Sequence, residues 1–214
     1  MKDKLIRWGG PALVLGGLLW VLTYAVEIVI GVTLGAETYA RPDASASLLE
    51  WLWPVTFAGA ILALGVGLLG VAARVGARAR VAGYVGAVLP CVAIGAATVT
   101  LVTLSGALGA PSASDDVGFL GVIGVVAGAI VVGIGTLRAA VLPRWSRWVL
   151  ALLPLFFVPA IIATIPLESV APDYVVADLP FPVVGLALAA VGRAMLRDRA
   201  PAGGQALAGT PRTQ

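Results

Sequence analysis

Charged residues are almost absent from six long apolar stretches of this chain and gather between them. The hydrocarbon core of a bilayer is about 30 Å thick, so a helix that crosses it needs about 20 mostly apolar residues. Six segments meet or nearly meet that length, at residues 8–33, 51–73, 81–107, 117–137, 145–166 and 179–196. Hydrophobic residues make up 60% of the chain, whereas soluble domains usually contain about 45–50%. We therefore predict an all-α, polytopic transmembrane bundle of six helices within residues 1–199.

The basic residues predict the orientation of this bundle, because Lys and Arg are retained on the cytoplasmic flanks of spanning helices. With the N-terminus inside, thirteen of the fourteen basic residues lie on the cytoplasmic side, and only Arg41 lies outside. The last stretch is short and bracketed by Asp178 and Arg193, but without it the four C-terminal arginines would lie on the opposite face. We predict a multi-pass protein of the cell (plasma) membrane with both termini cytoplasmic.

The two ends of the chain differ in character. The first apolar stretch follows a basic start, as in a secretory signal, but it exceeds the core of about 7–15 residues typical of such signals, so we interpret it as a retained helix. Residues 200–214, rich in Gly, Ala, Pro and Thr, are expected to form a disordered cytoplasmic tail. Because topology explains the net charge of +3, the lipid bilayer is the expected partner and nucleic acid is not.

Most acidic residues are expected on the outer face, opposite the arginines. They are Glu37, Asp43, Glu50, Asp115, Asp116, Glu168, Asp173 and Asp178. Such a face can capture a cation or a basic partner, or its acids can simply solvate loops from which basic residues are excluded. The second interpretation is the favoured one.

Part of the sequence matches itself at an offset of 64 residues. Identical pairs include Arg74 and Arg138, Arg80 and Arg144, Pro90 and Pro154, and Thr100 and Thr164. A true repeat would make the second and third helices, and the fourth and fifth, two parallel helical hairpins. The alternative is chance matching in a chain dominated by Ala, Val, Leu and Gly.

Glycines recur at helical spacing in the fourth stretch, at Gly118, Gly121, Gly124 and Gly128. Membrane helices gain little from the hydrophobic effect when they associate, so they depend on close contact between small residues. This stripe predicts a helix-packing surface, either within the chain or between copies. A homo-oligomer or another membrane protein is therefore an expected partner.

Glu27 is the only acid well inside a predicted helix. An ionisable group at the bilayer centre costs about 2.5 kcal/mol or more, so it normally has a partner or a function. Trp20, Tyr24 and Glu27 share one helical face and predict a polar pocket for a proton, an ion or another ligand. Thr98, Thr100, Thr103 and Ser105 are expected to supply hydroxyl groups at similar depth. The alternative, which we favour, places Glu27 at the outer headgroups.

Absent residue types exclude several chemistries. The chain has no histidine and one cysteine, Cys91, so bis-histidine haem ligation, Ser-His hydrolysis and thiol exchange lack their required groups. No intramembrane lysine, aspartate pair or nucleotide-binding loop is present either. We therefore expect no catalytic residues, no metal site and no cofactor, and we expect that the protein is not an enzyme.

Residues 136–150, TLRAAVLPRWSRWVL, resemble a stretch found in uncharacterised multi-pass membrane proteins of high-GC bacteria. The residues of this segment predict a basic cytoplasmic turn broken at Pro143, and the resemblance implies no activity. Two function classes remain. The first, which we favour, is a non-catalytic structural or partner-binding membrane protein; the second is a transporter of a small solute, ion or lipid that uses the pocket around Glu27.

Overall fold

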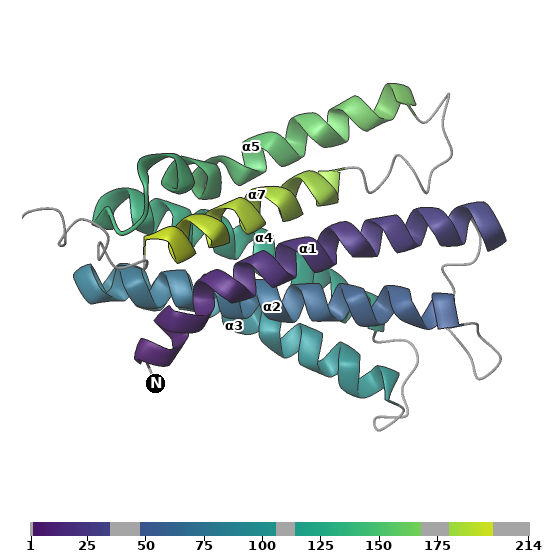
Figure 1. Cartoon of the computed structure of the whole chain (residues 1–214), viewed down its shortest axis with the longest axis horizontal. Helices are drawn as coiled ribbons and strands as arrows, with labels where there is room; N and C mark the ends of the chain where they lie inside the picture. The colour runs from purple at the N-terminus through teal and green to yellow at the C-terminus, as the bar shows by residue number, and fades with distance from the viewer. Residues whose placement is uncertain (1, 35–47, 106–113, 168–179, 199–214) are drawn as a thin grey trace, which may run out of the picture.

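A computed structural model describes residues 2–34, 48–105, 114–167 and 180–198. In this part of the chain every regular element is an α-helix (Figure 1). The helices are α1 (Lys2–Leu34), α2 (Leu48–Arg78), α3 (Arg80–Leu104), α4 (Ser114–Ala139), α5 (Arg144–Leu167) and α7 (Pro180–Arg197). The predicted tail at residues 200–214 and the end of the third apolar stretch lie outside the described residues.

Five of these helices are long and apolar enough to cross a membrane: α1, α2, α3, α4 and α7. The prediction of an apolar, all-helical bundle is therefore confirmed for the described residues, and five of its helices are candidates to span a membrane. The remaining predicted crossing, at residues 145–166, corresponds to α5, where several side chains lie outside the described set, and it stays a prediction. Both α1 and α2 continue past their apolar cores into basic segments, because Lys and Arg are themselves good helix formers.

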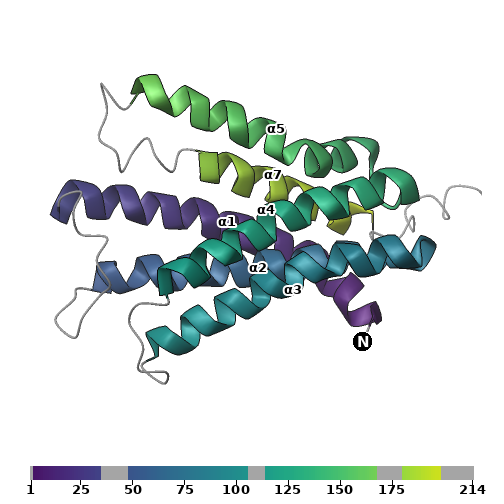
Figure 2. The same ribbon diagram turned by 180° about the vertical axis from the view of Figure 1, so that it is seen from behind.

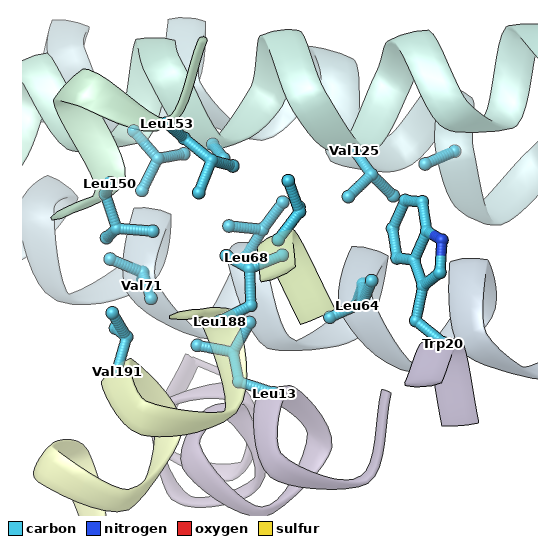
Figure 3. Close-up of a cluster of buried hydrophobic side chains, with 14 of the residues drawn as sticks. Leu13, Trp20, Leu64, Leu68, Val71, Val125, Leu150, Leu153, Leu188 and Val191 are labelled. Atoms are coloured by element: carbon cyan, nitrogen blue, oxygen red, sulfur yellow. The ribbon is translucent and has the colours of Figure 1, made fainter. Parts of the chain in front are cut away.

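The helices form a ring in which each packs on its neighbours in the sequence (Figures 1 and 2). The ring is closed by α7, which packs against α1 and α5, and α2 also contacts α4 across it. Leucine, valine and alanine side chains fill the interior, and Leu13, Leu64, Val125 and Leu188 are fully buried there (Figure 3). The described core is thus an apolar one to which all six described helices contribute.

One end of the bundle collects the basic residues. Gly9 of α1 meets Gly70 of α2 there, and Gly10 meets Gly192 of α7, so the start of α1 lies beside the ends of α2 and α7. The described basic residues at these helix ends are Lys4, Arg7, Arg74, Arg78, Arg80, Arg138, Arg144, Arg147, Arg193 and Arg197. The described basic residues therefore gather at one end of the folded chain, whereas most of the acids predicted for the other face lie outside the described residues.

The turn between α4 and α5 lies at this basic end. Ala140 adopts a left-handed conformation, with φ of 51°, and its N–H donates to the Thr136 carbonyl at 2.9 Å. An Nη1 atom of Arg78 donates to the carbonyls of Ala139 and Ala140 at 2.8 and 2.9 Å. The last carbonyls of a helix lack partners within it, so Arg78 of α2 caps the end of α4 and joins the two helices.

The start points of two helices agree with the proposed repeat. Helix α3 begins at Arg80 and α5 begins at Arg144, which are two of the residues paired by the 64-residue offset. Agreement in start points does not establish equivalent structure, and the repeat stays a prediction.

Candidate functional site

Glu27 lies on the interior face of α1 and is only 7% exposed. Leu13 and Trp20 precede it at intervals of seven residues, which is about two helical turns. Both are core residues, with exposures of 0% and 2%. Because these three positions share one face of the helix, the Glu27 side chain is attached to the side of α1 that faces the bundle interior.

Trp20 lies against the first turn of α7. Its indole stacks on the ring of Phe181, with centroids 5.7 Å apart and an angle of 18° between the planes. Aromatic pairs with this separation and this nearly parallel geometry stabilise the packing between their helices. Trp20 also belongs to the buried cluster with Leu64 and Val125 (Figure 3). The structure therefore places this predicted site residue in the packing between α1 and α7.

Tyr24 is half-buried and lies between Trp20 and Glu27 on α1. The neighbouring Thr23 is buried, and its hydroxyl donates to the Leu19 carbonyl at 2.9 Å. On α2, the buried Thr56 donates to the Leu52 carbonyl at 2.8 Å. Side-chain bonds to the preceding turn satisfy such hydroxyl groups inside their own helix.

The contact register of α1 on α2 brings Thr56 to the depth of the candidate site. Gly16 meets Leu64, and Leu19 meets Gly59 one turn further along. One more turn in the same direction reaches Thr23 on α1 and Thr56 on α2. Spacing along the sequence does not distinguish these two threonines, since each is isolated in an apolar run and only the helix register reveals their common depth.

The hydroxyl groups predicted to accompany Glu27 lie on α3. Thr98 and Ser105 are exposed, whereas Thr100 and Thr103 are buried. The main helix contacts of α1 are with α2 and α7, so α3 is not its packing neighbour. Thr100 donates to the Ala96 carbonyl at 3.0 Å. The register of α1 on α2 therefore adds Thr23 and Thr56 to the buried hydroxyl groups at the depth of Glu27.

The four glycines of the predicted packing stripe are all buried where α4 meets α2 and α3. A Cβ added at Gly118 would lie 3.3 Å from Phe57 Cε1, and one at Gly121 would lie 3.0 Å from Ile61 Cδ1. A Cβ at Gly124 would lie 2.9 Å from the backbone nitrogen of Ala93, and one at Gly128 would lie 3.1 Å from Pro90 Cδ. Each glycine therefore faces another helix of the same chain.

Helix α1 makes its tightest glycine contacts at two consecutive pairs, Gly9–Gly10 and Gly16–Gly17, which lie seven residues apart. In each pair the first glycine faces α2 and the second faces α7. A Cβ at Gly9 would lie 2.8 Å from Gly70 Cα, and one at Gly16 would lie 2.7 Å from the backbone nitrogen of Leu64. Gly10 and Gly17 face the carbonyls of Gly192 and Gly185. The signal that could have found these contacts is the seven-residue spacing, which α7 repeats at Gly185 and Gly192.

Two further results concern ligands and relatives. Within the described ranges there is no group of at least three Cys, Asp and Glu side chains placed to hold a metal ion. No protein-family model, curated protein or solved structure matches this chain. The resemblance of residues 136–150 to bacterial membrane proteins therefore stays a prediction.

Proposed function

We propose that this chain is a multi-pass protein of the cell membrane that crosses it six times, with both termini in the cytoplasm. The end of the bundle where the arginines collect supports this orientation, because basic flanks stay on the cytoplasmic side during insertion. A reporter fused after Gln214 is then expected to be protected from protease added to intact cells and cleaved once the membrane is opened. Cleavage in intact cells would contradict this orientation.

We further propose that the protein is a non-catalytic, partner-binding membrane protein. The main support for this proposal is the large exposed face of α3. Only 33% of the residues in the most apolar part of α3 are buried, whereas the corresponding share in α2 is 61%. The exposed face of α3 carries Cys91, Gly95 and Thr98 among exposed valines, and no atom of another helix lies within 4 Å of a Cβ built at Gly95. Small residues of this kind let another helix backbone approach closely.

The partner that fits this face best is a second copy of the chain. Copies in one membrane share an orientation, so a twofold axis would place two α3 helices side by side and parallel. Small side chains around Gly95 make such a face complementary to itself. By contrast, the outward positions on α1 include three large leucines, Leu15, Leu18 and Leu22, which suit contact with lipid chains.

Cys91 allows this partner to be tested in the natural sequence, because it is the only cysteine and is exposed on the same face of α3. Mild oxidation of membranes is expected to join two copies as a disulfide-linked dimer. Such a bond requires Cβ atoms about 4 Å apart, so it reports close approach of the two α3 helices. Gly95→Leu, which fills the predicted crossing point, is expected to suppress the dimer.

A matched control moves the cysteine to another exposed position. The double variant Cys91→Ala, Val29→Cys places a thiol on the outward face of α1, where Val29 is 46% exposed. It is expected to stay monomeric on SDS gels after the same oxidation. Equal dimer formation at both positions would indicate random collision, and absence of a Cys91 dimer would show that the partner is not a second copy.

The burial of Glu27 favours a second candidate function, a transporter of a small solute, ion or lipid. A buried polar donor lies on the adjacent helix: Trp53 Nε1 has no acceptor among the described residues. Buried polar groups without partners are rare in stable cores and often indicate a functional site. Solute flux into liposomes would then depend on Glu27, and Glu27→Gln is expected to abolish it while leaving the fold intact. Flux that is unchanged in that variant would dismiss the transporter.

A further inference from the structure

An open groove lies at the basic end of the bundle, between the first turns of α3 and the last turns of α4. Its volume is about 530 Å³. Arg80 of α3 and Arg138 of α4 stand in its lining, together with Val85, Val131 and Ile134. The groove therefore combines two cations with an apolar wall, and none of the candidate site residues discussed above contributes to it.

Polarity changes in the same direction along both walls of the groove. On α3, Arg80 begins the helix and Val85 lies five residues deeper, or about 7.5 Å along the axis. On α4, Arg138 lies in the last turn and Val131 lies seven residues deeper, or about 10 Å. A ligand that follows this groove meets positive charge at the end of the bundle and hydrocarbon further in.

Nothing within the described residues neutralises these two arginines. Both are exposed, and neither pairs with an acidic side chain there. Arg78, by comparison, is occupied with the carbonyls at the end of α4. The start of α3 adds to the attraction for an anion, because Ala79 at its N-cap makes no side-chain capping bond and the first backbone N–H groups of a helix carry partial positive charge.

We propose that this groove binds an anionic phospholipid, with the phosphate at Arg80 and Arg138 and an acyl chain along Val85, Val131 and Ile134. Basic pockets at the cytoplasmic ends of membrane helices are suited to anionic headgroups. The apolar depth of the groove argues against a free phosphate ion, which would leave that wall without a partner. The inference rests on the proposed membrane embedding and is independent of Glu27 and of α3 pairing.

The test uses the full-length protein, extracted from membranes and purified in a neutral detergent. Phosphatidylglycerol and phosphatidylcholine with the same acyl chains are titrated in, and bound lipid is counted by native mass spectrometry. Phosphatidylglycerol is expected to bind more tightly. The pair Arg80→Gln, Arg138→Gln is expected to weaken it about tenfold or more. The control pair Arg193→Gln, Arg197→Gln removes equal charge from α7 at the same end and is expected to change the affinity little.

Two further measurements separate a lipid site from general attraction of charge. Val85→Trp fills the groove without changing its charge and is expected to reduce phosphatidylglycerol binding; Val85 is exposed, so the bulk is tolerated. Inorganic phosphate at millimolar concentration is expected not to displace the lipid. Equal losses in both arginine pairs, no loss with Val85→Trp, or displacement by phosphate would each overturn the proposal. A chain recovered in the soluble fraction would instead overturn the membrane assignment.

Discussion

Gly17→Ala is expected to lower the free energy of unfolding by about 1–3 kcal/mol, although alanine is the better helix former. The added methyl group would overlap the carbonyl oxygen of Gly185 and lie 2.9 Å from the backbone nitrogen of Ala189. Backbone atoms of α7 cannot rotate away as a side-chain end can, so the two helices must separate. In a membrane, where close packing drives helix association, that separation removes much of what holds α7 in place.

The change in stability is measured by titrating SDS into the detergent-solubilised protein and following helix loss by circular dichroism. Gly59→Ala is the matched control, because its methyl group would find only Leu19 Cδ1, at an ordinary 3.6 Å. That variant is expected to be as stable as the natural chain or more stable, by up to about 1 kcal/mol. The two substitutions should therefore differ in sign. A stabilising Gly17→Ala would show that α1 and α7 are not in backbone contact.

These glycine contacts show what the sequence can and cannot predict. Apolar length identified the helices, since the thickness of the bilayer sets that length. The stripe at Gly118 to Gly128 could be recognised because four glycines within one helix lie on a common face. Gly17 and Gly185 occur in different helices, and the seven-residue glycine spacing that the two helices share indicates two packing faces without specifying that they face each other. Which helix faces which is a tertiary property, and it had to come from the structure.

The same distinction applies to Glu27. The sequence predicted its depth, about one membrane thickness beyond the basic start of the chain, and depth alone is compatible with either a headgroup or a buried position. The missing information was the direction of the helix face. Leu13 and Trp20 supply it, because their burial identifies the face on which Glu27 also lies. A buried carboxyl group needs polar neighbours. Thr23 and Thr56 are buried at a similar depth, and the spacing of residues within one helix could not reveal this.

Trp20→Ala is expected to destabilise the bundle by about 3–5 kcal/mol, the cost typical of removing a large buried aromatic side chain. The indole is 2% exposed and stacks on Phe181, so its loss leaves a cavity between α1 and the start of α7. SDS titration should show the loss directly. Trp20→Phe keeps a stacked ring pair and a smaller apolar volume, and it is expected to recover most of the lost stability.

This pair of variants also decides what Trp20 does. If its role is packing, stability should follow ring volume through tryptophan, phenylalanine and alanine, since only the filled space matters. If instead the indole binds a ligand beside Glu27, Trp20→Phe should retain the fold yet lose binding or flux, because phenylalanine lacks the indole N–H. A Trp20→Ala variant as stable as the natural chain would contradict the packing of α7 on α1 at this position, since a fully buried ring cannot be removed there without cost.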